Sequence, residues 1–200
     1  MYAQQWALCC LITVGSSLVF ADDAGVTVVL QHPDRLSSAM LGEMKSELGS
    51  LMETAGYQIH WRDLQNSTSA ADGDVVVVEL RGSCAPPPRP DVQPSVVQLG
   101  SSAVADGKVL PFTWVDCTQL ARMLESHLTR AQQEKRDFVY GRAIARVAAH
   151  EMHHVLERTL DHTETGISKA RFALDDLLDE RVVSGHVAAA FAPSRLMAVP

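Results

Sequence analysis

The chain is short of positive charge. Its 200 residues hold 17 Lys and Arg against 24 Asp and Glu, which gives a formal net charge of −7. Proteins that bind nucleic acid need Lys and Arg clustered opposite the phosphates, and no run of like charge stands out here. The composition therefore argues against a nucleic-acid partner. One globular domain is the simplest organisation, because 200 residues, 46% of them hydrophobic, can bury a sizeable core.

Charged residues are missing altogether from the start of the chain. The first 21 residues contain no Lys, Arg, Asp or Glu, and Ala7 to Phe20 is almost continuously apolar. Val19-Phe20-Ala21 fits a small-residue cleavage site before Asp22, although a basic N-terminal region is absent. We expect residues 1–21 to be a cleaved export signal, so that the mature protein is secreted or periplasmic. A membrane anchor is the alternative, but about 15 apolar residues are short for a span.

Cysteine is scarce as well. Of the four cysteines, Cys9 and Cys10 would leave with the signal, and Cys84 and Cys117 remain as a pair. An oxidising compartment favours a disulfide between these two, closing a loop of about 30 residues. Two separate buried thiols are the alternative.

Hydrophobic periodicity predicts an α+β fold with a sheet on one side of a helix near residue 150. Asp106-Gly107 is a hairpin signal between two of the expected strands. Five Pro between Cys84 and Pro94 predict a surface connection there. The domain is expected to span 22–187, followed by a disordered tail at 188–200. Strands are expected at 26–31, 57–61, 75–80, 96–99 and 109–115. Helices are expected at 36–54, 117–133 and 172–183, and Lys135-Arg136-Asp137 separates the second of these from the helix near residue 150.

Pro and Gly are absent from Arg142 to Asp161, which favours a continuous helix. The segment contains His150-Glu151-Met152-His153-His154, an HExxH pattern. Residues i and i+4 lie on one face of a helix, so both outer histidines can bind one metal ion. Two imidazoles at this spacing suit Zn²⁺, and the adjacent Glu can take a proton from a metal-bound water. One buried face of this helix is marked by Ile144, Val147, Ala148, Met152, Val155 and Leu156.

A zinc site needs a third protein ligand. His162, eight residues after His154, is one candidate, and Gly166 permits a tight turn in the chain nearby. An acid on the following helix, such as Asp175, is the alternative ligand. His153 is rotated by roughly 100° from its neighbour around the helix, and we expect it at the cleft rim or in solvent.

The segment AHEMHHVLERTLDHTETGISKA (149–170) resembles the active-site segment of small secreted bacterial zinc metallopeptidases related to the metzincins. The shared pattern is HExxH, seven residues, His, and Gly-Ile soon after. The resemblance extends more weakly to the Cys84 and Cys117 pair and to residues 110–117. It implies a metzincin-like twisted mixed sheet packed on the active-site helix. It also implies zinc on His150, His154 and His162, with Glu151 as the general base.

The chain departs from the metzincin pattern at several points. The third His stands two residues later than in HExxHxxGxxH, and the Gly that bends the helix is missing. Ser168 stands where some relatives carry the Met of a Met-turn. No Tyr follows Tyr140, so a Tyr that stabilises the oxyanion cannot come from the C-terminal part.

These observations predict an exported zinc metalloendopeptidase. Its partner would be a peptide or protein substrate, held by strand addition on the sheet edge nearest the helix. No nucleic-acid partner and no stable membrane span after signal cleavage are expected, and the oligomeric state is not predicted. Two alternatives remain: an exported zinc-binding or interaction protein without peptide chemistry, and a structural zinc site that only pins the helix.

Overall fold

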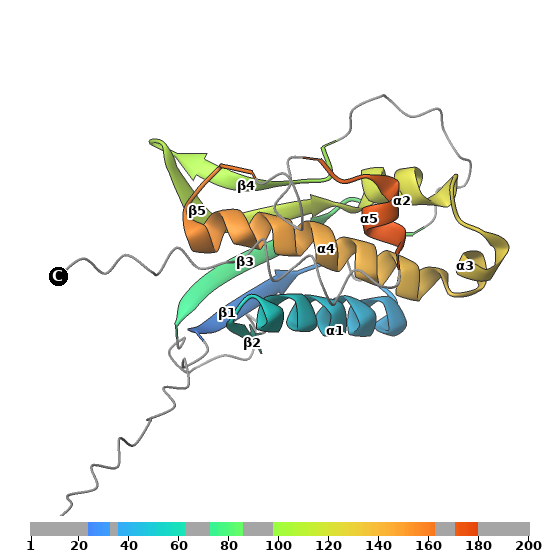
Figure 1. The fold of residues 1–200 in the computed structure, drawn as a ribbon, viewed down its shortest axis with the longest axis horizontal. Coiled ribbons are helices and arrows are strands. Elements are labelled where there is room, and N and C mark those ends of the chain that lie inside the picture. The colour runs from blue at the N-terminus through green and yellow to red at the C-terminus, as the bar shows by residue number, and fades with distance from the viewer. Residues whose placement is uncertain (1–23, 33–35, 63–72, 86–97, 163–170, 180–200) are drawn as a thin grey trace, which may run out of the picture.

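The computed structural model describes residues 24–32, 36–62, 73–85, 98–162 and 171–179 (Figure 1). The expected signal at 1–21, the tail at 188–200 and most of the Pro-rich segment lie outside the described residues, and so do Gly166 and Ser168. Among the described helices, none is both long and apolar enough to cross a membrane.

Five strands form one mixed sheet. They are β1 (Ala24–Gln31), β2 (Tyr57–Arg62), β3 (Asp74–Arg81), β4 (Gly100–Ala105) and β5 (Lys108–Asp116). Their spatial order is β2-β1-β3-β5-β4. β1 pairs in parallel with β2 and β3, β3 pairs in parallel with β5, and β4 is antiparallel to β5 at one edge. The parallel pairs require crossovers, and a helix supplies the one from β1 to β2.

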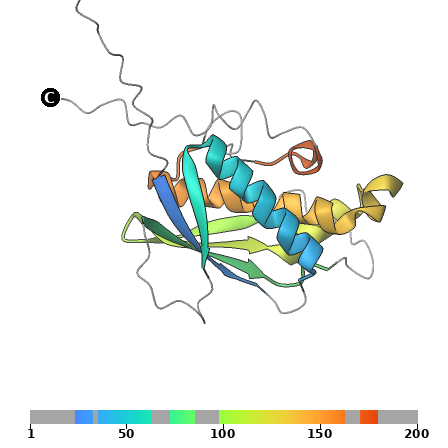
Figure 2. The same ribbon diagram turned by 90° about the horizontal axis from the view of Figure 1, so that it is seen from below.

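Two long helices cover one face of this sheet. α1 (Ser38–Thr54) makes the β1-to-β2 crossover, and α4 (Arg136–Glu157) lies beside it on the same face (Figure 2). The β3 side chains that alternate toward the helices, Val76, Val78 and Leu80, are buried in the core. α1 contributes Met44 and Met52, both 0% exposed, which shows that its methionines fill the core. The α+β class expected from the sequence is therefore confirmed, with the sheet on one side of the motif-bearing helix.

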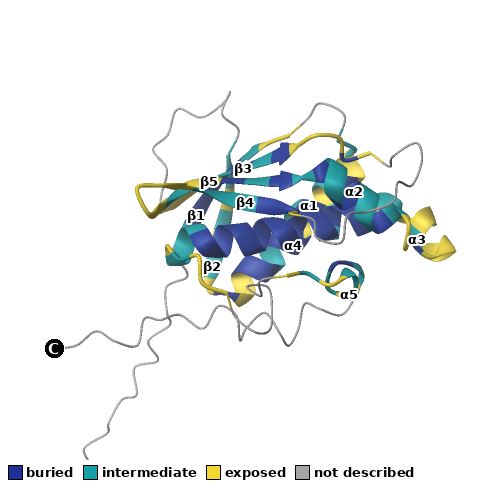
Figure 3. Ribbon diagram, turned by 90° about the horizontal axis from the view of Figure 1, so that it is seen from above, coloured by how far each residue is buried: buried dark blue, intermediate teal, exposed yellow. Residues whose placement is uncertain are grey.

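Three short helices also lie within the described residues. They are α2 (Cys117–Glu125), α3 (Arg130–Glu134) and α5 (Leu174–Leu178). α5 packs against α4 on the side away from the sheet, so that α4 is enclosed between them and is the most buried helix (Figure 3). Leu177, 0% exposed, is the core residue that α5 contributes.

Several predicted boundaries were wrong. The helix predicted at 117–133 is two helices, because Thr129 caps α3: its hydroxyl accepts from the Gln132 N–H and the Gln132 side chain accepts in return. Of the strand predicted at 96–99, residues 98 and 99 lie ahead of β4, which begins at Gly100, and residues 96 and 97 lie outside the described residues. The last helix, predicted at 172–183, spans only 174–178 within the described residues. Lys135 alone separates α3 from α4, which begins at Arg136.

The hairpin predicted at Asp106-Gly107 is confirmed. These two residues join β4 to β5 with φ values of 51° and 71°. Two consecutive positive φ values are the mark of a type I′ turn, whose twist matches that of the flanking strands.

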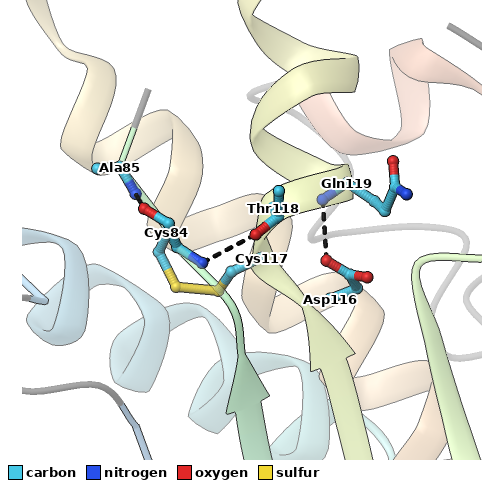
Figure 4. The surroundings of a disulfide bond; sticks show 7 residues. Cys84, Ala85, Asp116, Cys117, Thr118 and Gln119 are labelled. Atoms are coloured by element: carbon cyan, nitrogen blue, oxygen red, sulfur yellow. Dashed lines mark hydrogen bonds between the residues drawn. A yellow bond between two sulfur atoms is a disulfide. The ribbon is translucent and has the colours of Figure 1, made fainter. Parts of the chain in front are cut away.

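The predicted disulfide between Cys84 and Cys117 is present, with the two cysteines 33 residues apart in sequence. It joins the segment that follows β3 to the first residue of α2, next to the pairing of β3 with β5 (Figure 4). The Thr118 hydroxyl accepts from the Ser83 N–H at 2.9 Å beside the bond. Strand pairing, the hydrogen bond and the disulfide therefore hold the same end of the sheet.

Candidate metal centre

Helix α4 places the HExxH residues inside the molecule. His150, Glu151, His153 and His154 are between 4% and 7% exposed. The i, i+4 pair of histidines therefore faces protein rather than solvent, and the ring of Phe172 packs against that of His150. The buried position of His153 corrects the expectation that it lies at the cleft rim or in solvent. Burial lowers its pKa, because desolvation disfavours the imidazolium.

The chain reverses direction directly after α4, without the glycine that the HExxHxxGxxH pattern of the metzincins has at this turn. Arg158 takes the left-handed conformation, with φ 53° and ψ 37°, and the Thr159 N–H donates to the His154 carbonyl. This is the helix ending that Gly usually makes, adopted here by a residue with a Cβ. The turn brings His162 back over the helix.

His150, His154 and His162 come together, as the sequence predicted. One nitrogen from each lies within 4.8 Å of the others. The Nε2 atoms of His150 and His154 are 3.1 Å apart, close to the spacing of about 3.3 Å between two nitrogens on a tetrahedral zinc. The ring of His162 is 5.3 Å from that of His150 and 4.8 Å from that of His154, centroid to centroid. His162 is the exposed member of the cluster.

The hydrogen bonding of His154 fits a metal ligand. Its Nδ1 lies 2.9 Å from the Thr159 carbonyl oxygen, which can only accept, so Nδ1 carries the proton. Nε2 then offers its lone pair toward His150. Burial, the largest cause, lowers the pKa of His154, which favours the neutral imidazole that binds metals. A backbone carbonyl behind a ligating histidine is a common arrangement in zinc sites.

The donor set fits zinc. Three imidazoles are the protein ligands of one class of catalytic zinc site, in which the fourth position stays open for water or substrate. Within the described ranges the grouping contains these three histidines and no carboxylate. Asp175, the alternative third ligand, lies exposed on α5 outside the grouping. The geometry thus favours His162 over Asp175.

Glu151 lies between the helix and the edge of the sheet. It is 5% exposed, and burial raises the pKa of its carboxyl to about 7, although the hydrogen bond from Ser102 lowers it. The Ser102 hydroxyl of β4 is 2.9 Å from Glu151 Oε2 and 2.9 Å from the Glu151 carbonyl oxygen. A carboxyl group with a pKa near neutrality can exchange protons easily in this range.

Sequence reasoning missed several residues around the cluster. Ser102 and the Thr159 carbonyl carry no signal in the sequence, because their roles depend on contacts made by folding. Phe172 was read only as part of a helix, yet its ring lies 5.4 Å from that of His150, edge to face. His60 and His127 are exposed and outside the grouping, in keeping with their places on a strand and a helix.

Comparison of the chain with protein families, curated proteins and solved structures finds no match. The site therefore has to be judged on its own geometry.

Proposed function

We propose that the protein is a zinc-dependent metallopeptidase that hydrolyses peptide bonds, with His150, His154 and His162 as zinc ligands. The observation that carries the proposal is the convergence of these three imidazoles, two of which lie on the helix that also bears the buried carboxyl group of Glu151. Zinc held there would act as a Lewis acid on the substrate carbonyl and lower the pKa of an attacking water. The metzincin-like resemblance of the sequence points the same way.

Glu151 is the general base in this proposal. Its carboxylate would take the proton of the attacking water and then pass a proton to the leaving amine. The bond from Ser102 keeps the carboxylate on the side of the helix that faces β4.

Strand β4 is the docking surface for the substrate in this proposal. It stands last in the strand order, so that among the described strands only β5 pairs with it. It also packs against α4 at Glu151. An extended peptide can add to such an edge through main-chain hydrogen bonds, which favours a peptide over a compact small molecule. In this proposal β4 is the sheet edge nearest the helix to which the sequence analysis assigned the peptide.

Metal analysis of the mature chain together with a peptide-cleavage assay tests the proposal. We expect about one zinc per chain and cleavage that chelators abolish and zinc restores. Glu151→Gln should retain the metal and lose at least about 100-fold in turnover. Cleavage by this variant at the native rate would show that Glu151 is not the base. Zinc bound by a wild-type chain that cleaves no peptide would instead favour a non-catalytic zinc-binding protein.

Zinc titration of two variants tests the third ligand. His162→Ala should lose zinc affinity by at least about 10-fold, because three protein ligands become two. Asp175→Ala is the matched control and should bind zinc as the wild type does. Full affinity in the first variant would contradict the three-histidine site.

A further inference from the structure

Ser102 is half-buried on β4 and faces helix α4, on the same side of the strand as Gly100. A Cβ built at Gly100 would lie 2.9 Å from Val147 Cγ1 and 3.0 Å from Glu151 Cγ. Only glycine therefore allows β4 to approach the helix this closely. The close approach brings the short Ser102 side chain within reach of Glu151.

The Ser102 hydroxyl donates to two oxygen atoms of a single residue. Both of its acceptors at 2.9 Å, a carboxylate oxygen and the main-chain carbonyl, belong to Glu151, which is 49 residues away in sequence. The single hydroxyl proton is shared between them. A Glu side chain has three rotatable bonds and can remain in several rotamers even when it is buried. A hydrogen bond at its carboxylate restricts these rotamers.

The backbone at Ser102 is itself held in place. Ser102 pairs with Thr113 of β5, and the Thr113 hydroxyl donates to the carbonyl of the preceding residue, Ser101, at 3.1 Å. The regular register of β4 with β5 ends between Ser102 and Val104. Such irregularities often aim a side chain at a functional site.

We propose that Ser102 is a positioning residue, whose hydroxyl fixes the Glu151 carboxylate relative to strand β4. Its consequence for catalysis rests on the proposed function. Because the peptide would dock on β4 and the base sits on α4, this hydroxyl sets the base relative to the bond that is cleaved. Loss of the hydroxyl leaves the zinc ligands and the docking edge intact and displaces only the base.

Steady-state kinetics of the zinc-loaded protein give the first test. Ser102→Ala should lower kcat roughly 10- to 100-fold, since small misplacements of a catalytic group cost this much. KM and zinc affinity should stay within about twofold, because neither the docking edge nor the ligands change. Ser102→Thr keeps the hydroxyl and should restore most of kcat.

Thr113→Val is the matched control. It removes a hydroxyl that bonds to β4 but does not touch Glu151. The main-chain pairing of β4 with β5 still holds Ser102, so kcat should remain within about twofold of the wild type. Equal losses of kcat in Ser102→Ala and Thr113→Val would overturn the proposal, as would failure of Ser102→Thr to restore activity.

A second measurement does not depend on activity. Urea unfolding of the metal-free wild type, Ser102→Ala, Glu151→Ala and the double variant forms a double-mutant cycle. We expect the second substitution to shift the unfolding midpoint less when the first is present, because the shared bond is already lost. The bond to the Glu151 main chain cancels in this cycle. Additive shifts would overturn the positioning role. If the wild type cleaves no peptide, the proposed function fails while this cycle still decides whether the hydroxyl holds the carboxylate.

Discussion

Replacing Arg146 with Met would test whether one buried arginine joins three helices of the domain. Arg146 lies on α4 one turn before His150 and is 0% exposed. Its Nε donates to Glu47 Oε1 of α1 at 2.8 Å, and Nη1 donates to the Asp176 carbonyl of α5 at 2.8 Å. The substitution keeps an apolar stem of similar length and removes both connections.

The expected loss of stability follows from the buried charge that the substitution leaves unpaired. Glu47, whose side chain is 8% exposed, would be left buried without its partner. Removing one member of a buried pair typically costs about 3–5 kcal/mol. For a domain of this size, about 1 kcal/mol corresponds to roughly 2–4 °C in Tm, so Tm should fall by roughly 6–20 °C. The double variant Arg146→Met with Glu47→Leu should recover most of this loss, because no charge stays buried.

Urea and thermal unfolding followed by circular dichroism provide the assay. Arg81→Met is the matched control: the Arg81–Glu79 pair has side chains 51% and 41% exposed and should contribute only about 0–1 kcal/mol. If Arg146→Met costs no more than this control, the reasoning is refuted. It is refuted equally if the double variant loses the sum of the two single effects, since the penalty would then not come from the unpaired charge.

Three further predictions concern the stability of the same domain. Arg158→Gly should raise the free energy of unfolding by about 0.5–1 kcal/mol, because Arg158 pays for a left-handed conformation that Gly adopts without strain; urea unfolding measures the gain, and a loss would show that the Arg side chain stabilises the turn. Replacing both Cys84 and Cys117 by Ala should lower the unfolding free energy by about 2–4 kcal/mol, measured against the oxidised wild type; an unchanged urea midpoint would contradict a contribution from the bond. Burial raises the pKa of Tyr140 above its usual value near 10, with the bond to Glu125 adding to the effect. The folded chain therefore keeps a proton that the unfolded chain releases, so stability should fall above pH 10 by up to about 1.4 kcal/mol per pH unit, and Tyr140→Phe should abolish this slope in unfolding measured from pH 9 to 11.5.

Local patterns in the sequence predicted the parts of the fold that depend on neighbouring residues. His150 and His154 share a face of α4 because a helix repeats every 3.6 residues. Asp106 and Gly107 make the hairpin because both tolerate positive φ. The pairing of Cys84 with Cys117 followed once Cys9 and Cys10 were assigned to the signal. In each case the relevant residues are close in sequence or are the only ones of their kind.

Helix boundaries were predicted less well, because competing local signals decide them. Leu120, Leu124 and Leu128 continue one apolar face across the point where α2 ends. The hydrogen bonds that Thr129 makes as a cap outweigh this continuity and start α3 instead. The left-handed Arg158 is a similar case, because the absence of Gly gave no indication that the chain would turn there.

The chain by itself determined which helix carries the imidazoles, where the hairpin turns and which cysteines are available to pair, since these follow from spacing and residue type. Only the tertiary structure decided the strand order, the burial of His153 and the contact of Ser102 with Glu151. It alone also brought Glu47 to Arg146, 99 residues apart in sequence. Such contacts depend on how sheet and helices pack against each other, and one-dimensional periodicity carries no information about which distant side chains that packing brings together.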